Sequence, residues 1–231
     1  MIGDRDTDLQ LAQKINLPGI KIDPKKENAW LEIKKEIMSL DKKSSVNRKT
    51  NETEITSTVD LSSDQRIDIK TGIGFYDHML EQFAKHSGIS VEIKCEGDLH
   101  IDEHHTVEDV AITLGDALSR ALSTKAGIER YGFTLPMDDA KCSVAIDLSG
   151  RPFFKFDGEF TRESICVLPT ELIIHFFYTI SQHLKANIHI SVTGDDDHHK
   201  AEACFKCFGR AFSQAINKTK ATGVPSTKGT L

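Results

Sequence analysis

The sequence predicts an α+β protein built as an internally duplicated α/β sandwich, in which each half is a small sheet with two helices on one face. Three observations carry this prediction. Short stretches alternate apolar and polar residues, two long segments place apolar residues at helical spacing, and both patterns recur along the chain. The prediction therefore covers the order of the elements as well as their type.

Alternating stretches are typical of strands that bury one face. They occupy residues 53–61, 66–70, 90–97, 141–148, 153–160 and 187–194. The apolar positions of the two long helices are Val107, Val110, Ala111, Leu114, Leu118, Ala121 and Leu122 in the first, and Ala201, Cys204, Phe205, Phe208, Phe212, Ala215 and Ile216 in the second.

The two halves repeat each other. Each of these positions in the second helix lies 94 residues after its counterpart in the first. Upstream, residues 78–98 align without gaps on residues 175–195 at an offset of 97, which pairs two further helical histidines with each other. The change of offset falls in a loop, where insertions cost least. We therefore predict an internal duplication, with halves at about 44–135 and 136–231.

Residues 1–43 differ in character from the rest. A short helix is expected around Trp30, Ile33 and Ile37, and the polar stretch 41–49 is interpreted as a linker. The predicted organisation is thus an N-terminal segment, 1–43, followed by a main domain, 44–231.

Composition excludes several classes of protein. The 231 residues, 39% hydrophobic and 28% charged, are ordinary for a globular protein, and a net charge of −6 gives no reason to expect nucleic acid as a partner. The N-terminus lacks the apolar run of a signal peptide, and no stretch approaches membrane-spanning length. The five scattered cysteines indicate reduced thiols, and Cys204 and Cys207 are expected to pack within a helix. We expect a cytoplasmic protein.

Two adjacent histidines followed by a glutamate stand at the start of each long helix, as HHTVE at 104–108 and HHKAE at 198–202. The glutamate lies four residues after the first histidine and three after the second, so its carboxylate can approach either imidazole. Adjacent histidines, however, diverge by roughly 100° and can hardly bind the same ion. One such motif is usually a solvated first turn, with Asp102 or Asp197 as an ordinary capping residue. Its repetition in phase with a repeated core favours a metal site.

Adding the two helical histidines gives six imidazoles and two carboxylates, enough for two ions with positions left open for substrate. The predicted ligands are His78, His104, His105, Glu108, His175, His198, His199 and Glu202. Which histidine binds which ion stays open. His86 and His183 also repeat, and packing or a role at the site is equally open for them.

The residues resemble the imidazoleglycerol-phosphate dehydratase family of histidine biosynthesis over about residues 46–231. The resemblance rests on RKTNET, TGIGFYDHML, GDLHIDEHHTVEDVAITLG, GIERYG, PMDDA, DLSGRP, HHKAEACFK and PSTKG. It implies a duplicated α+β half, two Mn²⁺ ions per active site, and trimers that assemble into a homo-oligomer of 24 subunits. Asp139 departs from the family, which usually has glutamate there, and the loop before His198 is one residue short.

The resemblance also implies a reaction, the removal of water from D-erythro-imidazole glycerol phosphate to give imidazole acetol phosphate. Two ions on the ring nitrogens would hold the ring as imidazolate, whose electrons expel the hydroxyl group next to the ring. Glu52 matches the family's glutamate and is the expected base for the C2 proton, with metal-bound water as its rival. Among the expected substrate-binding residues are Glu52, His78, His86, His104, Glu108 and His198.

The phosphate of the substrate needs fixed cations. The residues that match the family's phosphate-binding motifs are Arg130, Arg151, Lys206, Ser226, Thr227 and Lys228. Lys206 lies four residues after Glu202 on the same helical face, which places it near the metal independently of the resemblance. For Lys228 taken alone, a mobile tail is the ordinary interpretation.

The first twelve residues resemble the last acidic motif of a haloacid-dehalogenase-type phosphatase, which some organisms fuse in front of this dehydratase. Asp4 and Asp8 would hold Mg²⁺, but the nucleophile belongs to an upstream D-x-D-x-T loop, so we expect an inactive remnant. Two other functions stay open for the main domain. A metal-storing cage is disfavoured by the phosphate-binding set, and a di-metal phosphohydrolase would release inorganic phosphate.

Overall fold

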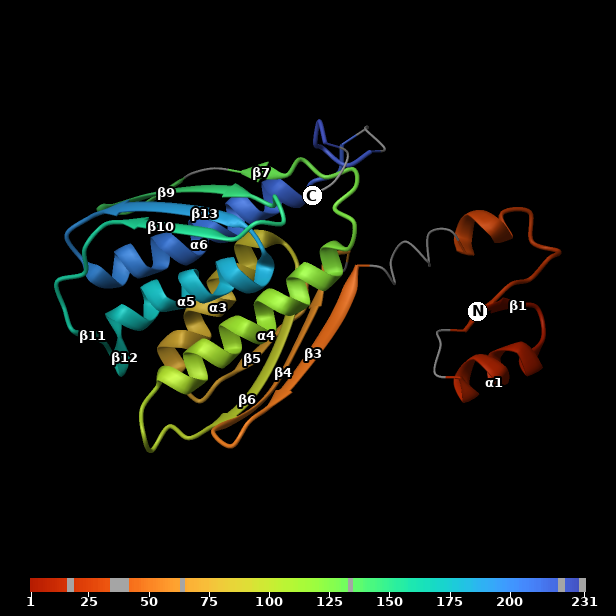
Figure 1. The fold of residues 1–231 in the computed structure, drawn as a ribbon, viewed down its shortest axis with the longest axis horizontal. Helices are drawn as coiled ribbons and strands as arrows, with labels where there is room; N and C mark the ends of the chain where they lie inside the picture. The colour runs from red at the N-terminus through yellow and green to blue at the C-terminus, as the bar shows by residue number, and fades with distance from the viewer. Residues whose placement is uncertain (16–18, 34–41, 63–64, 133–134, 220–222, 229–231) are drawn as a thin grey trace. The chain divides into compact units, whose positions relative to one another are not determined.

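The computed structural model describes residues 1–15, 19–33, 42–62, 65–132, 135–219 and 223–228. They form two compact units, Met1–Lys42 and Lys43–Leu231, which Figure 1 shows as ribbons. Within these ranges no helix is long and apolar enough to cross a membrane.

The N-terminal unit has a small core of its own. Its elements are β1 (Ile2–Gly3), α1 (Asp6–Lys14) and β2 (Ile20–Lys21), and β1 pairs in parallel with β2. Residues 29–33 are helical, in keeping with the helix expected around Trp30, whereas Ile37 lies outside the described residues. The core consists of Ile20, Ile22, Ala29 and Ile33.

The larger unit begins with a four-stranded sheet in the order β3-β4-β6-β5. Its strands are β3 (Lys43–Lys49), β4 (Thr53–Asp60), β5 (Ile67–Lys70) and β6 (Ser90–Gly97). Burial alternates along β4, so the prediction of a strand with one buried face is confirmed there.

The interpretation of residues 43–49 as a linker is wrong, because they form the edge strand β3. This strand pairs antiparallel with β4, from Lys43 opposite Asp60 to Lys49 opposite Glu54. Only Val46 of β3 is buried. An edge strand has one unpaired side toward solvent and is commonly polar, so its composition resembles that of a linker.

The second sheet has the order β10-β13-β9-β7, and β8 also pairs with β9. Its strands are β7 (Tyr131–Gly132), β8 (Leu135–Met137), β9 (Ala140–Asp147), β10 (Phe153–Asp157) and β13 (Asn187–Thr193). A short hairpin precedes the next helix, formed by β11 (Ser164–Ile165) and β12 (Leu168–Pro169).

The two sheets share a topology, which supports the proposed duplication. Each has a parallel pair, β5 with β6 and β10 with β13, followed by an antiparallel pair, β4 with β6 and β9 with β13. Glu54 pairs with Glu96, and Lys141 pairs with Thr193, which lies 97 residues after Glu96. Residues of β4 and β9 therefore correspond at an offset of 87, from 54 to 141.

Four helices lie between the sheets (Figure 1): α3 (Gly74–Ser87), α4 (His104–Leu122), α5 (Thr170–Leu184) and α6 (Asp197–Ile216). The helix of each half that carries a single predicted ligand packs against the long helix of the other half, α3 against α6 and α5 against α4. Stacked rings join the first pair, with Phe83 and Phe208 centroids 5.1 Å apart. Cys204 and Cys207 are buried in α6 and form no disulfide, as the packing prediction required.

Each helix pair meets at a glycine. A Cβ atom on Gly115 would lie 2.7 Å from Cβ of His183, and one on Gly209 would lie 2.7 Å from the carbonyl oxygen of Phe83 and 3.1 Å from Cβ of His86. These backbones approach too closely for a larger residue. His86 and His183 therefore both pack at helix crossings.

Candidate metal centre and active site

The first candidate centre, the α4/α5 triad, consists of His104, Glu108 and His175. The Nε2 atom of His175 lies 3.3 Å from Oε1 of Glu108, and Nε2 of His104 lies 3.9 Å from Oε2 of the same carboxylate. One donor atom from each residue falls within 4.8 Å of the others. Two imidazoles and one carboxylate are donors that suit a divalent transition metal, so the residues fit an ion.

The second candidate centre, the α3/α6 triad, consists of His78, His198 and Glu202. Oε1 of Glu202 lies 2.7 Å from Nε2 of His78 and 3.6 Å from Nε2 of His198. Its other oxygen accepts a hydrogen bond from Nζ of Lys206 at 2.7 Å, so Lys206 lies at this centre as expected. Burial opposes ionisation of Glu202, but the hydrogen bonds from Lys206 and His78 outweigh it and lower the pKa of the carboxyl group.

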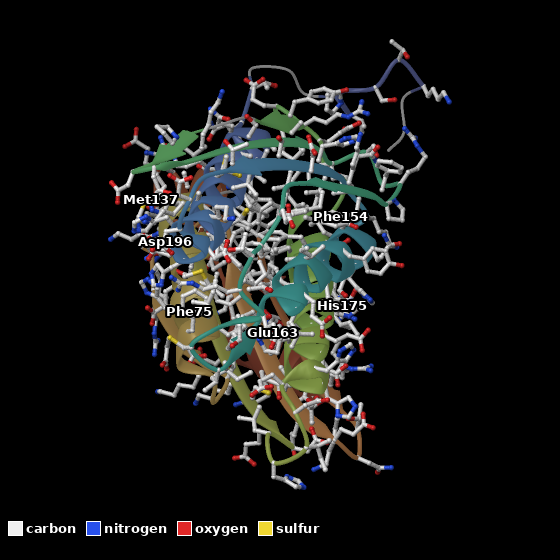
Figure 2. The ribbon with its side chains drawn as sticks, turned by 90° about the vertical axis from the view of Figure 1, so that its left-hand side faces the viewer. Phe75, Met137, Phe154, Glu163, His175 and Asp196 are labelled. Carbon is white, nitrogen blue, oxygen red and sulfur yellow. The ribbon has the colours of Figure 1, made fainter. Side chains whose placement is uncertain are left out.

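Each triad combines residues of both halves. In the α4/α5 triad, Glu108 of the first half contacts His175 of the second half, 67 residues away. In the α3/α6 triad, Glu202 of the second half contacts His78 of the first half, 124 residues away. Figure 2 shows His175 on the opposite side of the unit from Asp196, which precedes α6 by one residue. The two triads of one chain are therefore separate.

The second histidine of each motif turns away from its triad. The ring planes of His104 and His105 are inclined by 86°, and those of His198 and His199 also by 86°. Nδ1 of His105 lies 3.1 Å from Asp98, and Nδ1 of His199 is hydrogen-bonded to Asp139. These carboxylates raise the pKa of both imidazoles.

A carboxylate on Nδ1 fixes the tautomer of the ring and leaves the lone pair of Nε2 free for a metal. Asp98 and Asp139 therefore suit His105 and His199 to bind an ion outside their own triads. Sequence reasoning missed both aspartates as functional residues. The alignment of Asp98 with Asp195 in the two halves could have indicated a role for Asp98. It would have misled for the second half, where His199 is hydrogen-bonded to Asp139 and not to Asp195.

Glu52 stands in the turn between β3 and β4, with Oε1 3.9 Å from Nε2 of His105 and a side chain 52% exposed. Asp139 corresponds to it at the offset of 87 residues. Unlike Glu52, Asp139 accepts the backbone N–H groups of Asp196 and Asp195 as well as His199, and these bonds hold its pKa far below the usual range. Of the two equivalent carboxylates, Glu52 has the more exposed side chain, 52% against 32%.

The predicted caps of the motif helices are half right. Asp102 accepts the N–H of His104 at 2.8 Å. At α6 the capping carboxylate is Asp196, which accepts the N–H of His198, so the assignment of Asp197 as the cap is wrong. Asp197 is 1% exposed, and its carboxylate accepts hydrogen bonds from the backbone N–H and the hydroxyl group of Thr161. The carboxylate is therefore buried against this loop and does not cap the helix.

Five of the six predicted phosphate-binding residues line an open cavity of ≈ 590 Å³: Arg130, Arg151, Ser226, Thr227 and Lys228. Nη2 of Arg130 donates a hydrogen bond to Oδ2 of Asp147 at 2.9 Å. Nη1 of Arg130 donates one to the carbonyl oxygen of Pro225, also at 2.9 Å. The pKa of Arg130 is raised by its hydrogen bond to Asp147. Lys206 is absent from this cavity lining, because it lies at the α3/α6 triad.

The cavity lies at the opposite end of α6 from the triad. The backbone N–H of Arg130 donates to the carbonyl oxygen of Ala215 at 2.8 Å. Ala215 follows Glu202 by 13 residues along α6, which corresponds to about 20 Å at 1.5 Å per residue. The α3/α6 triad and the cationic cavity of one chain are therefore well separated.

Comparison with known proteins gives a consistent result. The model of the family described as imidazoleglycerol-phosphate dehydratase matches residues 71–212. Relatives include the histidine biosynthesis bifunctional proteins HisB of Stenotrophomonas maltophilia, 47% identical over 234 residues, and of Legionella pneumophila, 49% identical over 231 residues, and both alignments cover 100% of this chain. The chain spans 65% of the length of either relative.

Two solved structures share the fold. The imidazoleglycerol-phosphate dehydratase of Staphylococcus aureus is 32% identical with a TM-score of 0.70, covering 77% of this chain and 99% of that one. The enzyme of Pyrococcus furiosus, solved with (S)-C348, is 34% identical with a TM-score of 0.69, covering 80% of this chain and 100% of that one. By its family match, its relatives and its fold, this chain belongs to the imidazoleglycerol-phosphate dehydratase family.

Proposed function

We propose that this chain dehydrates D-erythro-imidazole glycerol phosphate to imidazole acetol phosphate in histidine biosynthesis, in the cytoplasm. The observation that carries the proposal is the pair of histidine–glutamate triads, each accompanied by a further histidine held by a carboxylate. Family membership and the names of the bifunctional relatives support the substrate.

The ligands proposed for two Mn²⁺ ions per active site are His78, His104, His105, Glu108, His175, His198, His199 and Glu202. All offer nitrogen or oxygen, the donors that manganese accepts in proteins. When bound, the ions supply Lewis acidity at the two ring nitrogens, which stabilises negative charge on the ring of the substrate.

Glu52 is proposed to accept the proton of ring carbon C2. Its half-exposed carboxylate is reachable by a ligand and lies beside His105, one of the proposed metal ligands. Of the motif residues, His78, His104, Glu108 and His198 would face the substrate near its ring, and His86 beside Lys206 remains a predicted contact. The burial of His86 lowers its pKa, and the nearby charges of Lys206 and Arg210 lower it further, so a neutral imidazole is favoured there.

The phosphate is proposed to bind in the cavity of Arg130, Arg151 and Ser226–Lys228, where two guanidinium groups and an ammonium group can neutralise a dianion. The substrate spans only about 8 Å at ordinary bond lengths of about 1.5 Å. The substrate cannot reach from the α3/α6 triad of one chain to the cavity of the same chain, about 20 Å away along α6. The active site is therefore proposed to be shared between subunits, within a homo-oligomer of 24 built from trimers.

An assay with Mn²⁺ separates the proposed function from its alternatives. The full chain is expected to convert imidazole glycerol phosphate to a product whose enolised ketone absorbs in the ultraviolet, without release of inorganic phosphate. Phosphate release would indicate the phosphohydrolase, and neither product would indicate a binding cage.

Residues 1–42 are proposed to correspond to the C-terminal part of a haloacid-dehalogenase-type phosphatase domain. Their apolar cluster, Ile20, Ile22, Ala29 and Ile33, is separate from the core of the larger unit. We expect a chain of residues 43–231 to keep the kcat and KM of the full chain, because every proposed site residue lies within it. A steady-state comparison of the two chains at equal manganese content checks this, and a large loss of kcat in the shorter chain would show that the N-terminal unit takes part.

A further inference from the structure

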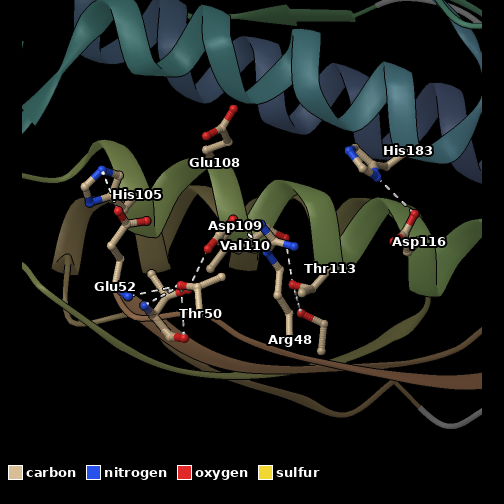
Figure 3. Close-up of polar contacts among 12 residues, drawn as sticks. Arg48, Thr50, Glu52, His105, Glu108, Asp109, Val110, Thr113, Asp116 and His183 are labelled. Atoms are coloured by element: carbon tan, nitrogen blue, oxygen red, sulfur yellow. Dashed lines mark hydrogen bonds and ion pairs between the residues drawn. The ribbon is translucent and has the colours of Figure 1, made fainter.

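A buried carboxylate joins both strands that flank the turn carrying Glu52. Asp109 is 5% exposed and follows Glu108 on α4. Its Oδ1 accepts a hydrogen bond from Nε of Arg48 in β3 at 2.8 Å, and its Oδ2 accepts one from Oγ1 of Thr53 in β4 at 2.6 Å. Figure 3 shows Glu108 directed toward α5 and Asp109 directed toward the strands. Two consecutive residues of α4 therefore have different partners: Glu108 belongs to the α4/α5 triad, and Asp109 contacts the strands on either side of the turn.

The turn itself is fixed by a second set of hydrogen bonds. Oγ1 of Thr50 accepts the N–H groups of Glu52 at 3.1 Å and of Thr53 at 3.0 Å. The carbonyl oxygen of Glu52 accepts the N–H of Asp98 at 3.0 Å. Asp98 in turn holds His105. The Glu52 backbone is therefore tied to α4 in two ways, by the contacts of Asp109 on either side of it and through Asp98 and His105.

The second half of the chain fills the corresponding positions differently. At offsets of 87 residues for the strands and 94 for the long helix, Arg48, Thr53 and Asp109 correspond to Leu135, Ala140 and Ala203. Ala140 and Ala203 are both buried, so two of these three positions in the second half hold small apolar side chains. Replacement of an ion pair that contains a buried charge by apolar residues is often neutral for stability. Asp109 is buried here while the Arg48 side chain is 40% exposed, so the fold alone gives no reason to keep Arg48, Thr53 and Asp109. Arg48, Thr53 and Asp109 occur in the half whose turn carries Glu52.

We propose that Asp109 is a positioning residue, which with Arg48 and Thr53 holds the turn 50–53 against α4 so that Glu52 stands at a set distance from His105 and the metal-binding face of that helix. The inference rests on the proposed function in taking Glu52 as the base. A displacement of about 1 Å can cost about 100-fold in rate, because proton transfer requires close and aligned groups.

The test replaces Arg48, Thr53 and Asp109 by the residue types found at the corresponding positions 135, 140 and 203. The triple variant Arg48→Leu, Thr53→Ala, Asp109→Ala leaves no unpaired charge from this set and is expected to fold. Its kcat is expected to fall about 100-fold while KM and bound manganese stay unchanged. The matched control, Ser57→Val with Thr113→Cys, takes the residues found at 144 and 207 and removes another buried polar pair between β4 and α4, whose oxygens lie 2.8 Å apart. The control is expected to keep the wild-type kcat.

Amide hydrogen exchange in the metal-loaded full chain provides a measurement independent of the reaction. Faster exchange at the amides of Glu52 and Asp98 is expected in the triple variant and not in the control. If the wild-type chain proves inactive, the proposed function fails while the exchange result still decides this inference. Wild-type exchange at these amides, or a wild-type kcat in the active protein, would overturn it. Asp109→Asn, which keeps the shape of the side chain, answers the same questions should the triple variant not fold.

Discussion

Removal of metal with a chelator is expected to abolish turnover of imidazole glycerol phosphate, and addition of Mn²⁺ is expected to restore it. Imidazole and carboxylate groups alone cannot stabilise negative charge on the ring of the substrate. The loss should therefore be complete rather than partial. Undiminished turnover in protein that elemental analysis shows to be metal-free would contradict the two-ion proposal.

Two variants test the triads separately. Glu108→Gln removes the carboxylate of the α4/α5 triad, and Glu202→Gln removes that of the α3/α6 triad. Each is expected to reduce bound manganese to about half, because one triad remains intact, and to lower kcat strongly, because both ions are needed. Glu171→Gln, at an exposed position in the first turn of α5, is the matched control and should retain full metal content.

Substitution of His105→Ala together with His199→Ala is expected to convert a large assembly into a smaller one, a trimer, while each subunit stays folded. Within its own chain each of these imidazoles contacts carboxylates rather than the triad beside it. As metal ligands they would have to complete triads of neighbouring subunits. One strong metal bridge then couples metal binding to assembly. Both side chains are about one-third exposed, 32% and 34%, so their loss leaves the core intact.

Analytical ultracentrifugation with metal analysis measures the outcome. The matched control removes two histidines that lie outside both triads, His100→Ala with His189→Ala, and should leave the particle at full size because both side chains are exposed. A double variant at positions 105 and 199 that kept full size and ordinary metal content would show that the paired histidines are not bridging ligands.

The main elements and much of the site chemistry follow from local sequence patterns. Alternation and helical spacing identified the core strands and the two long helices, since burial of one face constrains residue type at regular intervals. The same reasoning explains why His104 and His105 diverge, because adjacent helical residues are separated by roughly 100° around the axis. The edge strand β3 escaped detection because only Val46 of its residues is buried.

Tertiary packing determined which residues meet. The sequence showed that His78 and His175 repeat, but their partners, Glu202 and Glu108, depend on which helices pack together. Helical spacing specifies the apolar face of a helix without specifying the helix that covers it. The pairing of α3 with α6 and of α5 with α4 is what exchanges the helical histidines between the halves.

By itself the sequence determined the family resemblance, the repeated motif and the donor types, because these depend on residue identity and short spacing. The tertiary structure alone decided three further relationships. It separated the cationic cavity from the α3/α6 triad, made Asp139 a partner of His199 while Glu52 stayed exposed, and buried Asp109 between Arg48 and Thr53. Each joins residues far apart in the chain, so each depends on how sheets and helices pack, which short-range spacing does not encode.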